Sequence, residues 1–293
     1  MFAGAHTALV TPFSPNGTID SEAYRNLIDK QFDNGIKGVV PVGTTGESAT
    51  LSTEEHHRVI ELAVKQTHGR GIVIAGTGSN STREAIDLTQ AAELAGADAA
   101  LLVTPYYNKP SQEGLFQHYR AISESTEIPL MLYSIPGRCH IEIEVDTVVR
   151  LAAECPNIKA IKEAGGVTER VRQLRSALPE EFEILSGDDA LTVDFMKEGA
   201  VGVVSVASNL IPGVMADLVS AMSEGRVGDA EELHSKYSPL FEGFLKLDTN
   251  PVPIKAALGL TGECRPNLRL PMVEMSEDKV AQLRGILESL GLV

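Results

Sequence analysis

Lys162 is the residue whose type and position most clearly indicate chemistry. It ends the stretch Ile-Lys-Ala-Ile-Lys at positions 158–162, so a cation stands at the end of a short, mostly apolar run. A buried ammonium group is unfavourable, and the usual outcome is a lowered pKa that leaves a neutral, nucleophilic amine. Such an amine can form a Schiff base with a ketone. In the alternative, structural interpretation, Lys162 pairs with Glu163 or with another carboxylate nearby.

Three further side chains have types that suit chemistry beside such an amine. Tyr133 ends the preceding apolar run, and its phenol can carry a proton to or from an intermediate. In the alternative interpretation, Tyr133 is an amphipathic side chain at the edge of a core. Thr44 can link two phenols by hydrogen bonds, although threonine in a glycine-rich loop also serves simple turns. The planar guanidinium of Arg138 suits a substrate carboxylate, but it can equally pair with a protein carboxylate.

The elements that must position these residues are short apolar runs that alternate with segments of helical periodicity. Strands that are apolar throughout and separated by helices indicate a parallel sheet covered on both faces. Eight such units in about 220 residues predict a closed (β/α)8 TIM barrel, whose catalytic groups lie where the strands end. The predicted strands are residues 5–10, 38–42, 72–75, 99–103, 130–133, 159–162, 183–186 and 202–206.

Helix starts and the domain boundary can also be read from the sequence. Ser52 with Glu55, and Ser81 with Glu84, fit the capping box, in which a hydroxyl and a carboxylate satisfy free N–H groups. After residue 224 the strand pattern stops and helical periodicity continues. We therefore predict a catalytic barrel over residues 1–224 and a C-terminal helical region over residues 225–293, with helices at 229–247, 254–260 and 276–290.

Composition excludes several classes of function. The 25 Lys and Arg against 40 Asp and Glu give a net charge of −15, which disfavours nucleic acid and anionic membrane surfaces as partners. No apolar stretch approaches the roughly 20 residues of a spanning helix, and we read no signal peptide, so we expect a cytoplasmic protein. Cys139, Cys155 and Cys264 are too far apart in sequence for a Cys-x-x-Cys site, and the histidines lack metal-ligand spacing. Free thiols and metal-free chemistry are therefore expected.

Taken together, the motifs resemble a known family over essentially the whole chain. The chain resembles the pyruvate-dependent class I aldolases, the family of dihydrodipicolinate synthase and N-acetylneuraminate lyase. The motifs that carry this resemblance are Thr11-Pro12-Phe13, Gly43-Thr44-Thr45-Gly46-Glu47, Val103-Thr104-Pro105-Tyr106-Tyr107-Asn108-Lys109-Pro110, Tyr133-x-x-Pro136-x-Arg138, Ile161-Lys162-Glu163-Ala164, Leu185-Ser186-Gly187-Asp188-Asp189 and Asn250-Pro251-x-Pro253-x-Lys255.

The resemblance implies a complete mechanism without metal or cofactor. Lys162 condenses with pyruvate, and the resulting enamine attacks L-aspartate 4-semialdehyde to give 4-hydroxy-tetrahydrodipicolinate, as in lysine and diaminopimelate biosynthesis. Tyr133, Thr44 and Tyr107 match the proton relay, with Tyr107 supplied by a neighbouring subunit of a homotetramer built from dimers. Among substrate-binding positions, the resemblance assigns Thr45 and Gly187 to the pyruvate carboxylate, Val204 to the pocket wall and Arg138 to the semialdehyde carboxylate.

Other activities stay open at this point. The same mechanism serves aldolases of N-acetylneuraminate or 2-keto-3-deoxy sugar acids, and a non-catalytic relative would bind keto acids or lysine as a sensor. Thr44-Thr45 matches the loop of the synthase, where the sialic acid lyases typically have serine first. Arg138 also favours the synthase, because a short acidic aldehyde needs a carboxylate clamp whereas a sugar needs several hydroxyl partners. Ser134, Cys139 and His140 depart from the residues common in the family at these positions, beside the expected acceptor pocket.

The resemblance also implies an allosteric L-lysine site at a subunit interface. A carboxylate such as Glu84 beside His56 can pair with a cationic amino acid, or Glu84 serves only as the capping partner of Ser81. Thr53 stands where lysine-sensitive relatives often have histidine. The matching positions are Ser48, Ala49, His56, Asn80, Glu84 and Tyr106.

Overall fold

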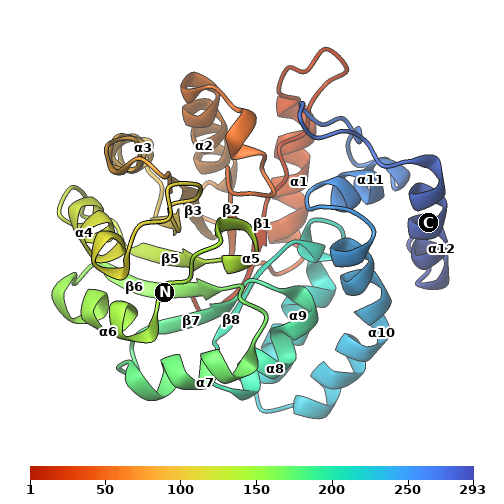
Figure 1. Ribbon diagram of the computed structural model, residues 1–293. Coiled ribbons are helices and arrows are strands. Elements are labelled where there is room, and N and C mark those ends of the chain that lie inside the picture. The colour runs from red at the N-terminus through yellow and green to blue at the C-terminus, as the bar shows by residue number, and fades with distance from the viewer.

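A computed structural model describes all residues, 1–293, and contains a closed barrel of eight parallel strands surrounded by helices (Figure 1). The predicted (β/α)8 TIM barrel with its C-terminal helical extension is therefore confirmed. The strands follow one another around the barrel in chain order: β1 (Gly4–Ala8), β2 (Gly38–Val40), β3 (Ile72–Gly76), β4 (Ala99–Val103), β5 (Leu130–Ser134), β6 (Ile158–Glu163), β7 (Glu183–Ser186) and β8 (Gly202–Ser205).

Two strands end two residues earlier than predicted, each for a local reason. β1 stops at Ala8, and the Val10 N–H donates to the Asn209 side chain instead of to a neighbouring strand, at 3.1 Å. β2 stops at Val40 because Pro41 has no N–H to donate. In both places the chain leaves the barrel for a loop at the rim.

Helices cover the outside of the barrel, and three more follow the last strand-helix unit (Figure 1). The helices around the barrel are α1 (Ser21–Asp33), α2 (Thr53–Thr67), α3 (Thr82–Leu94), α4 (Gln112–Ser123), α6 (Val145–Glu154), α7 (Thr168–Ala177), α8 (Thr192–Lys197) and α9 (Pro212–Ser223). The short helix α5 (Pro136–Cys139) lies at the barrel mouth instead (Figure 1). The C-terminal helices are α10 (Val227–Lys246), α11 (Val252–Leu260) and α12 (Glu277–Ser289). The predicted domain boundary after residue 224, between the catalytic barrel and the C-terminal helical region, stays a prediction.

One of the two predicted capping boxes is complete. At the start of α2 the Ser52 hydroxyl accepts from the Glu55 N–H while the Glu55 carboxylate accepts from the Ser52 N–H. At α3 the prediction was only half right. Ser81 accepts from the Glu84 N–H, but the Glu84 carboxylate accepts from the Ser79 hydroxyl and so is turned away from the cap.

The interior is divided between a small cluster inside the barrel and larger ones between strands and helices. The inner cluster contains Phe2, Met131 and Leu185 and also includes Tyr133. The C-terminal helices pack into the same outer cluster as β1 and β2, through residues such as Phe241 and Leu258. They are thus joined to the first part of the barrel, and none of the helices is long and apolar enough to span a membrane.

Candidate active site

A cavity of about 120 Å³ lies at the end of the barrel where the strands terminate. Six predicted site residues meet around it, together with other residues of the loop after β7 and of the C-terminal region. Its polar lining consists of Thr44, Thr45, Tyr133, Arg138, Lys162, Asp188, Asp189 and Asn250, and Gly187 forms part of the wall.

Lys162 occupies the base of this cavity. It is 5% exposed, and its register partner on β5 is Tyr133, whose ring centroid lies 4.3 Å from the amine Nζ. Burial lowers the pKa of Lys162 to about 8; the Asp189 carboxylate opposes this shift and the Arg138 guanidinium adds to it. An amine of this kind is partly neutral near pH 7 and can act as a nucleophile. Lys159, on the same strand, is exposed.

Tyr133 and Thr44 are brought together beside the amine. Burial raises the pKa of Tyr133 to about 12, against the opposing effects of Arg138 and of a hydrogen bond with the Thr44 hydroxyl. The phenol is therefore protonated at neutral pH and can donate a proton to an atom bound at Lys162. The contact between Tyr133 and Thr44 agrees with two parts of the predicted relay.

The loop after β7 places one glycine and one carboxylate against Lys162. A Cβ at Gly187 would lie 2.9 Å from Lys162 Cε and 2.7 Å from Ala164 Cβ, so only glycine leaves room for the lysine chain. Asp189 is buried, and its Oδ2 accepts from the Val206 and Ala207 N–H groups while Oδ1 has no partner. Burial raises the pKa of Asp189 to about 6, in opposition to these hydrogen bonds.

Thr45 and Arg138 are connected through a residue of the C-terminal region. The Asn250 side-chain amide donates to Thr45 Oγ1 at 3.0 Å, and the Asn250 main-chain oxygen accepts from Arg138 Nη2 at 2.9 Å. Thr45 is 3% exposed, whereas Arg138 is exposed at the cavity mouth. The site thus holds a hydroxyl donor and a guanidinium, and both kinds of group bind carboxylates.

Two predicted residues lie apart from this cavity. Tyr107 is 92% exposed, has a φ of +73°, and does not line the cavity. Val204 is fully buried in the inner cluster, and the wall position falls instead to Val206, two residues later. Ser134, Cys139 and His140 also do not line it.

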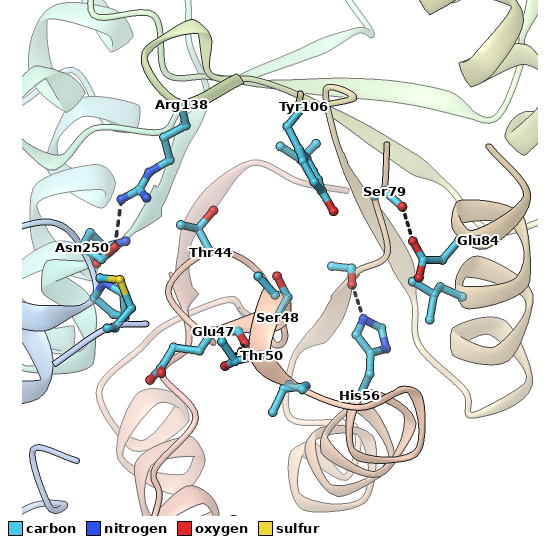
Figure 2. A pocket seen from close by; sticks show the side chains of 18 of the residues that line it. Thr44, Glu47, Ser48, Thr50, His56, Ser79, Glu84, Tyr106, Arg138 and Asn250 are labelled. Atoms are coloured by element: carbon cyan, nitrogen blue, oxygen red, sulfur yellow. Dashed lines mark hydrogen bonds between the residues drawn. The ribbon is translucent and has the colours of Figure 1, made fainter. Parts of the chain in front are cut away.

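A larger cavity, of about 520 Å³, adjoins the first and shares Thr44, Arg138 and Asn250 with it. Five of the six positions predicted for an effector line it: Ser48, Ala49, His56, Glu84 and Tyr106. Figure 2 shows Arg138 and Asn250 on one side and His56, Ser79 and Glu84 on the other. The sixth, Asn80, is not in the lining but donates to the Tyr106 main-chain oxygen at 3.1 Å.

His56 lines this larger cavity and has one ring nitrogen without a hydrogen-bond partner. Its Nε2 lies 2.9 Å from the Gly76 carbonyl oxygen, and Nδ1 is buried without a partner. Burial lowers the pKa of His56, which favours a neutral ring. Since a carbonyl can only accept, Nε2 carries the proton and Nδ1 is left with a free lone pair.

Asp189 and Asn250 line the site although the sequence analysis assigned no role to either of them. Asp189 ends the Leu185-Ser186-Gly187-Asp188-Asp189 motif after β7, so its place at the rim was a usable signal. Asn250 precedes Pro251 in a loop after a long helix, and no local pattern connects it to Thr45, which is 205 residues away. No group of three or more His, Cys, Asp or Glu side chains is placed to hold a metal ion.

Comparison with known proteins gives matches over the full chain. The dihydrodipicolinate synthetase family model matches residues 1–290. The 4-hydroxy-tetrahydrodipicolinate synthase of Oleidesulfovibrio alaskensis is 47% identical, over 100% of this chain and 99% of that protein.

Two solved structures are similar throughout. Chloride-inhibited dihydrodipicolinate synthase from Acinetobacter baumannii, complexed with pyruvate, is 42% identical with a TM-score of 0.97, covering 100% of both chains. The enzyme from Cyanidioschyzon merolae with lysine bound is 40% identical with a TM-score of 0.96, covering 100% of this chain and 99% of that one.

Proposed function

Because the chain belongs to the dihydrodipicolinate synthetase family, we propose that Lys162 carries out the condensation chemistry of this family in the 120 Å³ cavity. The chain is a lyase-type enzyme with the activity for which its relatives are named, a 4-hydroxy-tetrahydrodipicolinate synthase activity of lysine and diaminopimelate biosynthesis. The relatives favour neither the sugar-acid aldolase nor the non-catalytic sensor. Lys162 itself provides the electron sink, so the proposal needs no metal or cofactor.

The buried Lys162 amine is the observation that carries the proposal. Its neutral form attacks the ketone carbon of pyruvate, and loss of water gives an imine on Nζ. A proton leaves the pyruvate methyl group, and the enamine carbon then forms a bond to the aldehyde carbon of L-aspartate 4-semialdehyde. The substrate amine finally attacks the imine carbon, closes the ring and expels Lys162 as the free amine.

Carboxylate recognition follows from the two donors at the rim. Thr45 is buried in the cavity next to Lys162, which suits the carboxylate of the smaller substrate, pyruvate. Gly187 packs on the Lys162 chain and leaves space for the adduct. Arg138 lies where the small cavity opens into the larger one, so it suits the semialdehyde carboxylate. In our proposal Val204 contributes to the inner wall only from behind Val206.

Proton transfer requires a third group beside Tyr133 and Thr44, and the chain presents Tyr107 to the outside. Because Tyr107 is 92% exposed, we infer that it completes the relay in a second copy, within a homotetramer made of two such dimers. Mixing Tyr107→Phe with Lys162→Ala chains tests this. Each variant alone is expected to be nearly inactive, and random pairing should restore about a quarter of wild-type activity. Sedimentation of the mixture measures the assembly, and a fully active monomer would contradict the inference.

L-lysine is the effector that we propose for the 520 Å³ cavity. The similar enzyme from Cyanidioschyzon merolae was solved with lysine bound, which supports this choice of ligand. The free His56 Nδ1 and the Glu84 carboxylate can both accept from an ammonium group. Thr53 lines this cavity in place of the histidine of lysine-sensitive relatives. Calorimetric titration should show lysine binding that Glu84→Gln weakens, while Asp87→Asn on the exposed face of α3 leaves it unchanged.

The compartment that we propose is the cytoplasm. The three cysteines are unpaired, and Cys139 and Cys155 are buried, which suits a reducing environment. Fractionation of cells that produce the protein measures this directly.

Borohydride trapping with pyruvate is the experiment that tests the proposed chemistry. The wild-type protein should gain a reduced pyruvate adduct on the peptide that contains Lys162, and Lys162→Ala should gain none. Lys159→Ala, on the exposed side of the same strand, is the matched control and should form the adduct normally. The complete reaction is followed as NADPH loss with added dihydrodipicolinate reductase. An adduct on another residue, or none, would refute the role of Lys162.

A further inference from the structure

Asn250 lies between the two groups assigned to substrate carboxylates. Its side chain donates to Thr45 Oγ1 at 3.0 Å. Its main-chain oxygen accepts from Arg138 Nη2 at 2.9 Å, and this second bond is drawn in Figure 2. It lines both cavities. One residue of the C-terminal region therefore contacts both donors of the active site.

The polarity of the Thr45 contact decides what the Thr45 hydroxyl can do. A hydroxyl has one proton to donate and two lone pairs that accept. The Asn250 amide N–H occupies one lone pair, and no protein group accepts the hydroxyl proton. Because Thr45 is buried and lines the Lys162 cavity, that proton is available to a carboxylate bound there.

The Asn250 side chain is held although its other polar atom is unsatisfied. Its Oδ1 is buried without a hydrogen-bond partner, an arrangement that is unfavourable unless a site requires it. A second connection lies nearby, where Lys255 of α11 forms a fully buried ion pair with Glu47. Since Glu47 is two residues after Thr45, both ends of this short loop segment are tied to the same C-terminal segment.

We propose that Asn250 is a positioning residue that sets the Thr45 hydroxyl as a donor to the pyruvate carboxylate and holds Arg138 through its main-chain oxygen. The inference rests on the proposed function of the cavity. Asn250 would then have two roles. Its side chain would orient Thr45 at the pyruvate position, and its main-chain oxygen would hold Arg138 at the semialdehyde position.

Substitution of the side chain separates these roles. Asn250→Ala removes the amide but keeps the carbonyl, so we expect the KM for pyruvate to rise about tenfold while the KM for the semialdehyde and kcat change less than about threefold. Asn250→Asp fills the same space with reversed polarity. Its carboxylate accepts the Thr45 proton and repels the pyruvate carboxylate, so the pyruvate KM should rise further than in Asn250→Ala. A purely structural role predicts the opposite order, because Asp keeps the shape of Asn.

A double-mutant cycle tests whether the effect runs through Thr45. In a Thr45→Val background, Asn250→Ala should raise the pyruvate KM by less than about twofold, since the hydroxyl it orients is gone. An undiminished tenfold effect would overturn the proposal, as would an Asn250→Asp enzyme that binds pyruvate better than Asn250→Ala. Asn34→Ala, at the exposed end of α1, is the control and should match the wild type.

The readout is the pyruvate concentration that gives half-maximal borohydride adduct, because this value does not depend on how much of a variant is folded. If the wild type forms no adduct, the proposed function fails. If the wild type and both Asn250 variants form it at the same half-saturating pyruvate, the function stands and the role of Asn250 is refuted.

Discussion

The Lys162 amine should react with an acylating reagent far more readily than an ordinary lysine, and the pH dependence of that reaction measures why. Burial lowers its pKa from the usual 10.5 to about 8. Only the neutral amine reacts, so the rate rises as the pH passes through the pKa. With a pKa of about 8 the neutral fraction is about one tenth at pH 7 and about nine tenths at pH 9.

These fractions give a distinctive profile. The rate at Lys162 should rise about tenfold between pH 7 and pH 9 and then level off. An ordinary amine rises about a hundredfold over the same interval, without a plateau. At pH 7 the neutral fraction of Lys162 exceeds that of an ordinary lysine by about 300-fold.

Competitive labelling with trace acetic anhydride measures this profile. Nα-acetyl-lysine amide in the same tube serves as the reference amine, and mass spectrometry quantifies acetylation of the peptide that contains Lys162. The ratio of the two rates cancels the decay of the reagent. A Lys162 profile parallel to the reference up to about pH 10 would show that burial does not lower this pKa, and the argument from burial to nucleophilicity would fail.

Three further substitutions test the surroundings of the amine. Asp189→Asn removes a negative charge that favours the charged lysine, so the midpoint of the Lys162 labelling profile should move to lower pH; a shift to higher pH would contradict the assigned charge effect. Lys255→Met leaves Glu47 buried and uncompensated, which should cost about 3–5 kcal/mol, and an unchanged denaturation midpoint in guanidinium would refute this. Gly187→Ala should lower kcat/KM at least tenfold through its contact with the Lys162 chain; wild-type kinetics would show that the wall can move.

The sequence could predict the part of the site that depends on one strand and one topological rule. Lys162 ends an apolar run, and the ends of parallel strands meet at one rim, so Tyr133 and Gly187 had to lie near it. Thr44 follows the end of β2 and therefore belongs to the same rim. The direction of the Lys162 pKa shift could be predicted as well, because burial of a cationic group lowers its pKa.

The rest depended on packing that no local pattern records. Asp189 is predictable as a rim carboxylate, but its contact with the Val206 and Ala207 N–H groups depends on how the turn after β8 folds back. That turn also brings Val206 to the cavity wall in place of Val204. At α3 the capping pattern was correct in type, yet Glu84 found a competing donor in the Ser79 hydroxyl.

The C-terminal region shows most clearly why sequence position and role can differ. It follows the complete barrel, so its helical pattern is that of an appended segment. Yet it supplies Asn250 between the carboxylate-binding groups and Lys255 as the ion-pair partner of Glu47, in the loop that carries Thr45. A barrel rim made of short loops has no packed layer above it to hold a side chain in one orientation. A buried ion pair is at best weakly stabilising overall, so Lys255 and Glu47 are better understood by the loop geometry that they impose. We therefore regard the helices after the barrel as the layer that holds this rim in place. A fixed rim lets the carboxylates of pyruvate and of the semialdehyde bind at defined positions relative to the Lys162 amine.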